Sequence, residues 1–187
     1  MKFKVSKGLN IPISGNINPD KKNSVSVRNV ALLGEDYHGL KPTMLVKEGN
    51  VVIKGQNLFE DKKNPGVKFT SPVSGKIVEI NRGERRSFLS MVIEKNLNST
   101  SEVTFESFQD SSELSKDSVV KNLIESGTWT SFKTRPFSKI PKIDTIPEEI
   151  FISLISSDPL SLNPEDYLNH KADDFNFGLE VISYIPK

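Results

Sequence analysis

The first half of the chain consists of short β-prone segments that Gly, Pro and Asn interrupt at close intervals. Lys76 to Asn81 alternate polar and apolar residues, the pattern of a strand with one buried face. Closing many short strands into a compact barrel protects their edges. We therefore expect residues 1–95 to form a small all-β domain, with strands near Phe3–Val5, Val25–Leu33, Met44–Val46, Val51–Ile53, Lys68–Thr70, Lys76–Ile80 and Leu89–Ile93.

Charge and composition exclude several kinds of function. The 187 residues carry a formal net charge of +1, whereas nucleic-acid binders usually show a clustered basic excess. The absence of cysteine excludes disulfides, thiolate zinc sites, iron–sulfur ligation and a cysteine nucleophile. The N-terminus lacks the apolar core of a signal peptide, and no run approaches the ~20 apolar residues of a membrane span. We expect no direct membrane span, so membrane association would require a partner protein.

A polar, Ser-rich stretch at residues 96–114 is predicted to be a linker. Helix signals follow it, with Ser115 as the cap, Asp117 in the first turn and Gly127 placed to end the helix. Val119, Val120, Leu123 and Ile124 fall on one face of that helix.

Two further elements are predicted near the C-terminus. The apolar run Ile150–Ile155 is typical of a strand that is buried on both faces. A helix is predicted to begin after a cap at Asn163, with Pro164 in its first turn. Its apolar face would consist of Leu168, Ala172, Phe175, Leu179 and Ile182. Residues 115–187 thus resemble the start of an α/β layer that the chain leaves incomplete, and the whole is predicted to be α+β.

Few residues suggest chemistry. No two glycines form a Gly-x-Gly, so a phosphate cradle for a nucleotide or flavin is not expected. His38 and His170 lie in unrelated segments, and a surface or structural role is favoured for both. We expect no catalytic, cofactor-binding or metal-binding residues. The acidic residues Glu165, Asp166, Asp173 and Asp174 are interpreted as helix-end electrostatics and a solvated face rather than a hard-metal site.

Two other clusters leave alternatives open. The turn Arg82-Gly-Glu-Arg-Arg is either an exposed charged hairpin or a docking point for an acidic partner or lipid head groups. Trp129, Phe132 and Phe137, together with Arg135, belong either to the core or to an interface, since aromatic residues and Arg are enriched at interface cores.

Two segments resemble biotinyl- or lipoyl-carrying domains, which are barrel-sandwich hybrids. Phe59-Glu-Asp-Lys-Lys resembles the surroundings of a lipoyl lysine, and Ser71-Pro-Val-Ser-Gly resembles the segment downstream of it. In such domains the modified lysine sits at a tight hairpin tip. Here Asn64-Pro-Gly is expected to lengthen the tip and to displace Lys62 and Lys63, so a solvated basic loop is favoured over a modified lysine. A stand-alone carrier domain of an acyl or carboxyl transfer enzyme is kept as the alternative function.

A second resemblance covers Met1 to about Ile185. It is carried by segments that are similar to the A subunit of the sodium-translocating NADH:quinone oxidoreductases: Lys7-Gly-Leu-Asn-Ile-Pro-Ile-Ser-Gly, Ala31-Leu-Leu-Gly-Glu-Asp-Tyr, Gly39-Leu-Lys-Pro-Thr-Met, Asn81-Arg-Gly-Glu-Arg-Arg, Gly127-Thr-Trp-Thr-Ser-Phe-Lys and Asp158-Pro-Leu. That family is also similar to the NADH- and flavin-binding subunit of respiratory complex I and to a subunit of the Rnf complex. In those relatives a Gly-rich loop follows the first helix and holds flavin mononucleotide, whereas this chain has Gly127-Thr-Trp there.

The resemblance implies a peripheral scaffold or docking subunit, without catalytic residues of its own, in a bacterial respiratory complex that couples electron transfer from NADH to quinone to sodium export. It implies a position on the cytoplasmic side of the inner membrane and contacts with the other subunits, especially a membrane subunit. NADH, FAD, FMN, iron–sulfur centres and quinone are expected mainly on those other subunits, with quinone as a possible contact of this one. Family members are two to three times longer, so the chain is expected to be a fragment or a shortened natural product.

Overall fold

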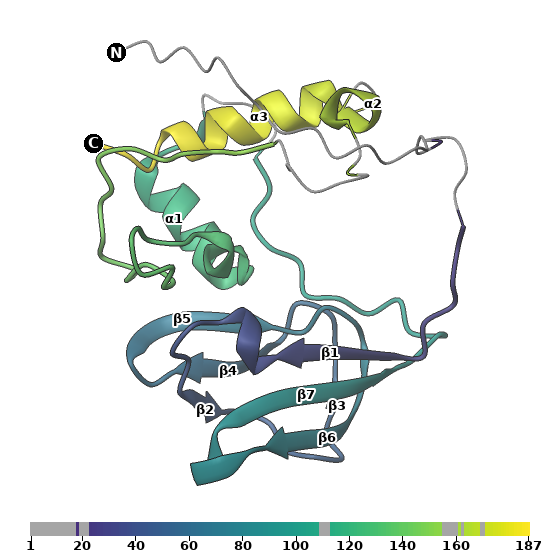
Figure 1. Cartoon of the computed structure of the whole chain (residues 1–187). Helices are drawn as coiled ribbons and strands as arrows, with labels where there is room; N and C mark the ends of the chain where they lie inside the picture. Colours follow the sequence, from purple (N-terminus) through teal and green to yellow (C-terminus); the bar gives the residue numbers. More distant parts are fainter. Residues whose placement is uncertain (1–17, 19–22, 109–112, 155–160, 162, 169–170) are drawn as a thin grey trace, which may run out of the picture.

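The computed structural model describes residues 18, 23–108, 113–154, 161, 163–168 and 171–187. Two antiparallel sheets form a barrel in its N-terminal part (Figure 1). The four-stranded sheet has the order β1-β7-β6-β3 and the three-stranded sheet the order β2-β4-β5. The strands are β1 (Asn29–Leu33), β2 (Pro42–Met44), β3 (Val51–Val52), β4 (Asn57–Asp61), β5 (Asn64–Thr70), β6 (Gly75–Arg82) and β7 (Phe88–Lys95).

Aromatic and aliphatic side chains from both sheets fill the barrel. Phe59 and Phe69 are paired across β4 and β5, and their rings stack with centroids 4.7 Å apart. Ile77 and Ile93 are paired across β6 and β7, and both are fully buried. Burying each such side chain contributes about 1.5–3 kcal/mol. The pleat thus sends alternate residues of β6 into the core, whereas on β4 the adjacent residues Leu58 and Phe59 are both buried.

The strand predictions are largely confirmed, with differences at the ends. The structure adds β4, because the predicted strands did not include Asn57–Asp61. β1 begins only at Asn29, and the strand predicted at Met44–Val46 lies two residues earlier, at Pro42–Met44. Phe3–Val5 lies outside the described residues.

The hairpin that joins β4 to β5 corrects one expectation. Asp61 is paired with Asn64, so Lys62 and Lys63 form a two-residue turn at the tip. Glu60 is paired with Lys68, and residues 65–67 therefore have no opposite residue on β4. The residues of Asn64-Pro-Gly are thus absorbed as a bulge in β5 and do not lengthen the turn.

The first helix forms as the sequence predicts. α1 spans Lys116–Glu125, and Ser115 caps it by accepting a hydrogen bond from the Ser118 backbone amide at 3.2 Å. The Ser118 side chain in turn accepts from the Ser115 backbone amide, which completes a capping box. Gly127 follows the helix with a φ of 80°, a left-handed value that glycine adopts readily, and a single 3₁₀ turn, η4 (Thr128–Ser131), comes next.

α1 lies between the barrel and a C-terminal helix, α3 (Ala172–Ser183) (Figure 1). Val120 and Ile124 pack against the barrel core, whereas Val119 belongs to a second cluster with Ile185. Phe177, Val181 and Ile182 of α3 pack against that second cluster, and Leu123 contacts both clusters. The described residues therefore form two core clusters, and α1 contributes to both.

The C-terminal predictions need correction. Residues 150–154 form no strand, and Phe151 is 87% exposed rather than buried on both faces. The predicted final helix is two helices, because α2 (Pro164–Leu168) is separate from α3. Asn163 accepts a hydrogen bond from the Glu165 backbone amide at 3.3 Å, in keeping with its predicted capping position.

Candidate functional site at the junction of the barrel and the C-terminal part

Strand β5 connects the barrel to the C-terminal part through three side chains. Asn64 donates from Nδ2 to the Pro141 carbonyl at 2.9 Å. Lys68 forms an ion pair with Glu125 of α1 at 2.5 Å, and Thr70 donates from Oγ1 to the Ser126 carbonyl at 2.9 Å. These three interactions come from side chains of one strand and hold residues 125–141 against the barrel.

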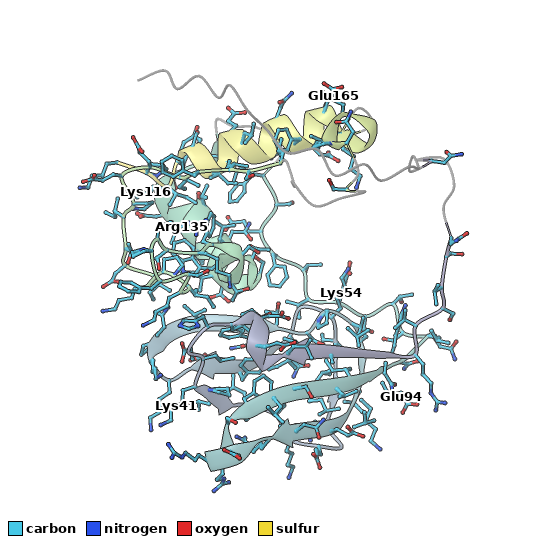
Figure 2. All side chains as sticks on the ribbon, in the orientation of Figure 1. Lys41, Lys54, Glu94, Lys116, Arg135 and Glu165 are labelled. Atoms are coloured by element: carbon cyan, nitrogen blue, oxygen red, sulfur yellow. The ribbon has the colours of Figure 1, made fainter. Side chains whose placement is uncertain are left out.

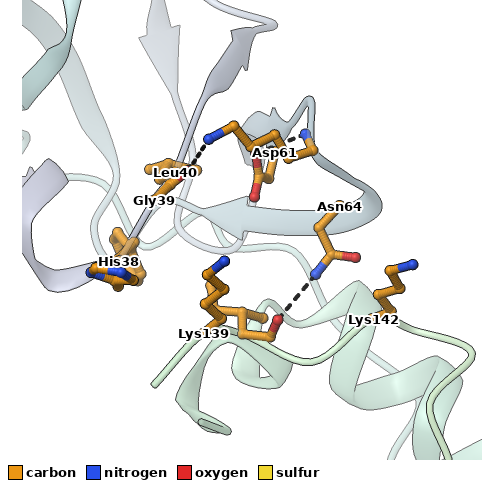
Figure 3. A pocket seen from close by; sticks show the side chains of 10 residues that line it. His38, Gly39, Leu40, Asp61, Asn64, Lys139 and Lys142 are labelled. Atoms are coloured by element: carbon orange, nitrogen blue, oxygen red, sulfur yellow. Dashed lines mark hydrogen bonds between the residues drawn. The ribbon is translucent and has the colours of Figure 1, made fainter. Parts of the chain in front are cut away.

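A pocket of about 250 Å³ lies at one end of this junction (Figure 3). Three segments surround it, namely the turn at residues 37–40, the tip of the β4–β5 hairpin and residues 139–142. The lining residues are Tyr37, His38, Gly39, Leu40, Asp61, Lys63, Asn64, Lys139, Ile140 and Lys142. The junction pocket, as we call it, exists only because the C-terminal segment folds back onto the hairpin.

The charged groups of the junction pocket are unequal in number. Lys63, Lys139 and Lys142 supply three ammonium groups, whereas Asp61 supplies the one carboxylate. Asp61 Oδ1 already accepts two hydrogen bonds, from the backbone amide of Lys41 at 3.1 Å and from that of Lys63 at 3.0 Å. Lys63 Nζ donates to the Gly39 carbonyl at 3.2 Å. The lining therefore holds a positive excess, and its carboxylate is partly used by the backbone.

Tyr37 forms the apolar wall of the pocket. Its ring meets Phe69 edge-on at 4.9 Å, and Lys133 Nζ lies 5.5 Å from the ring centroid. Burial raises the pKa of the Tyr37 phenol above its ordinary value of 10.0, and the neighbouring carboxylate of Asp36 raises it further. The phenol therefore stays protonated at neutral pH and can only donate or accept a hydrogen bond.

The residues singled out in the sequence have different surroundings. His38 is exposed and lines the pocket, while His170 lies outside the described residues. Trp129 is buried, and its Nε1 donates to the Pro141 carbonyl at 3.0 Å, so it packs in the core together with Phe132. Phe137 is 71% exposed and Arg135 is exposed as well (Figure 2). The core interpretation thus holds for two of the aromatic residues and fails for Phe137.

The turn after α1 contains one glycine, Gly127, and not a Gly-rich loop. A Cβ atom on Gly127 would lie 2.5 Å from Thr70 Oγ1, so the turn packs directly on β5. The Ser126 and Thr128 hydroxyls are hydrogen-bonded to one another at 2.8 Å. The glycine here serves close packing against the barrel, and its neighbours use their polar groups locally.

The acidic and arginine clusters lie on the surface. Glu165, Asp173 and Asp174 are exposed, and within the described residues no group of three or more His, Asp or Glu side chains is placed to hold a metal ion. The side chain of Asp166 lies outside the described residues. Arg82, Arg85 and Arg86 are exposed at the β6–β7 tip, where Arg85 and Arg86 have φ values of 52° and 62°.

The junction pocket itself was not predicted from the sequence. Its lining comes from segments separated by about twenty and about seventy-five residues, and no local motif links them. The sequence does show lysines close to a proline in two of these segments, at Lys62 and Lys63 and at Lys139 and Lys142. In the part of the chain that the structure describes, no helix combines the length and apolarity needed to cross a bilayer.

Comparison with known proteins identifies both parts of the chain. Residues 3–96 match the model of the NqrA N-terminal barrel-sandwich hybrid domain, and residues 114–187 match the NqrA second alpha/beta domain. The chain is 47% identical over 181 residues to the A subunit of the Na⁺-translocating NADH-quinone reductase from Marinomonas sp. strain MWYL1. That alignment covers 97% of this chain and 41% of the Marinomonas protein.

Two further relatives carry the same name. The chain is 49% identical to the protein of Glaesserella parasuis, in an alignment that covers 96% of this chain and 40% of the relative. It is 48% identical to the protein of Neisseria meningitidis, in an alignment that covers 97% of this chain and 40% of the relative. The chain thus spans about two fifths of the length of these relatives. The matches to both domains and the identity along nearly the whole chain show that it belongs to the NqrA family, the A subunits of the Na⁺-translocating NADH-quinone reductases.

Proposed function

We propose that this chain is a docking part of a Na⁺-translocating NADH-quinone reductase and contributes no catalytic group of its own. The observation that carries the proposal is how the turn after α1 packs. Gly127 lies against Thr70, and Trp129 is buried with its Nε1 bonded to Pro141. Backbone amides that cradle a flavin phosphate in a Gly-rich loop must be open to solvent. Here the same stretch is used to join the two parts of the chain.

The same packing supports a division of labour within the complex. We propose that NADH, the flavins, the iron–sulfur centre and quinone are held mainly by other subunits, on which this part docks from the cytoplasmic side of the inner membrane. We also propose quinone as a contact of this part. The absence of cysteine agrees with an iron–sulfur centre that is ligated elsewhere.

Membrane binding tests the docking role directly. Membranes are prepared from a strain that lacks only NqrA and from a strain that lacks the whole reductase. We expect the purified chain to cosediment with the first membranes and not with the second, because it docks on another protein of the complex. Equal cosedimentation with both would contradict the proposal.

A calorimetric titration tests whether this part binds NADH or FMN. Calorimetry with NADH and with FMN is expected to give no saturable heat, because the turn after α1 exposes no phosphate cradle. A sub-micromolar dissociation constant for either ligand would show that the chain has a nucleotide site of its own.

The carrier alternative is supported by one observation. Lys62 and Lys63 lie at the two-residue tip of the β4–β5 hairpin, where a carrier domain holds its modified lysine. Against it, Lys63 Nζ is bonded to the Gly39 carbonyl, and the adjacent Asn64 is covered by Pro141. A prosthetic arm needs a tip that is free to enter other active sites. Intact-mass measurement on protein from its native host decides, since an adduct on Lys62 or Lys63 would establish the carrier.

A further inference from the structure

We propose that the junction pocket binds a small dianion of the phosphate type. The inference stands independently of the docking role. It begins from the charges of the lining residues, which include three lysines and one aspartate and therefore carry a positive excess of two. All three lysines are exposed, so their ammonium groups are accessible to an anion, and the two charges of a dianion would match the positive excess.

The lysines of the C-terminal segment are available for a ligand. Among the described residues, neither Lys139 nor Lys142 forms an ion pair, whereas Lys54 and Lys68 each have a glutamate partner within 2.9 Å. Figure 3 shows Lys139 extending toward the loop of Gly39 and toward Asp61, with Lys142 beside Asn64 at the rim. Their ammonium groups are therefore the cations that a ligand would meet first.

The size of the pocket limits the ligand. Its volume of about 250 Å³ equals that of about eight water molecules at ~30 Å³ each. That is smaller than the ~300–1,000 Å³ typical of pockets for drug-sized ligands. A phosphate group fits this volume, whereas a nucleotide does not. Ammonium groups bind phosphate as point charges, and the Tyr37 phenol and exposed His38 imidazole are additional donors in the lining.

The pocket's position gives binding a structural consequence. Lys63 belongs to the barrel hairpin, whereas Lys139 and Lys142 belong to the segment that Asn64 holds through its bonds to Ile140 and Pro141. A dianion bound between them would join the barrel to the C-terminal part. Ligand binding should therefore stabilise the folded chain by mass action.

The test compares two double variants with equal loss of charge. Lys139→Ala/Lys142→Ala removes the pocket cations, and Lys47→Ala/Lys76→Ala removes two exposed lysines that do not line the pocket. Sodium phosphate is titrated at constant ionic strength and at a pH above its second pKa, where the dianion predominates, while NMR follows the Asn64 side-chain amide and the His38 ring. We expect saturable shifts in the wild type and in the control variant. In the pocket variant we expect at least a tenfold weaker affinity.

A second arm distinguishes a free phosphate from one carried by a lipid. Cosedimentation with phosphatidylcholine vesicles is measured with and without phosphatidic acid, whose phosphate monoester is also a dianion. Binding lost only in the pocket variant, to phosphate or to these vesicles, supports the site and identifies the source. Circular dichroism checks that both variants fold. If both lose affinity equally, or the wild type binds neither probe, the proposal is wrong.

Discussion

Replacing Gly127 by Ala should destabilise the chain more than the conformational preference of alanine alone explains. Gly127 has a φ of 80°, and a left-handed conformation costs a residue with a Cβ about 1–2 kcal/mol. The new methyl group would also lie 2.5 Å from Thr70 Oγ1 and 3.0 Å from its Cγ2. Overpacking of this kind costs about 1–3 kcal/mol, and separating Thr70 from the Ser126 carbonyl loses a hydrogen bond of about 1 kcal/mol. We expect a total of about 3–6 kcal/mol.

Gly49 supplies the matched control. Its φ is 86°, but a Cβ there meets nothing within 4 Å, so Gly49→Ala carries the conformational cost alone, about 1–2 kcal/mol. Thr70→Ala removes Oγ1 and Cγ2, and in that background Gly127→Ala should cost nearly as little as Gly49→Ala. Urea unfolding followed by the fluorescence of Trp129, the only tryptophan, reports the free energies. Equal costs for Gly127→Ala and Gly49→Ala would refute the packing argument.

Three further changes test other parts of the structure. Ser115→Ala removes the cap of α1 and should cost about 1 kcal/mol in urea unfolding, whereas Ser115→Asp should restore most of it. The raised pKa of Tyr37 contributes stability that is fully present below pH 10.0 and is lost as the pH rises through the folded-state pKa. The free energy of unfolding of Tyr37→Phe should therefore fall less steeply with pH in the alkaline range than that of the wild type. An unchanged slope would contradict this. Phe151→Ser should change stability by less than about 0.5 kcal/mol because Phe151 is 87% exposed, and a larger loss would mean that the residue is buried against a second copy.

The barrel could be predicted from the sequence because its signals are local. Alternation along residues 76–81 and the turn glycines mark strands without knowledge of their partners. β4 was missed since its core residues, Leu58 and Phe59, are adjacent, and a register shift between β4 and β5 there breaks the alternation. The same dependence on the partner strand made the Asn64-Pro-Gly insertion look like a longer turn.

The C-terminal errors have a related cause. Ile150–Ile155 has the composition of a buried strand, but β-propensity expresses packing against neighbouring strands. In residues 150–154 no strand forms, and Phe151, Ile152 and Leu154 are exposed. α1, by contrast, is defined by its capping box and by Gly127, which are features of the local sequence. The junction pocket escaped prediction because only tertiary contacts bring its three segments together.

The Pro141 carbonyl has a consequence for the order of folding. It accepts hydrogen bonds from Trp129, twelve positions earlier, and from Asn64, seventy-seven positions earlier. Closing the shorter loop costs less chain entropy, so the bond to Trp129 can form while the barrel is still unfolded. That bond would hold the carbonyl in place until the hairpin arrives. The slower, long-range closure then brings Asn64 to this carbonyl, and we expect its rate to depend on Asn64 far more than on Ser115.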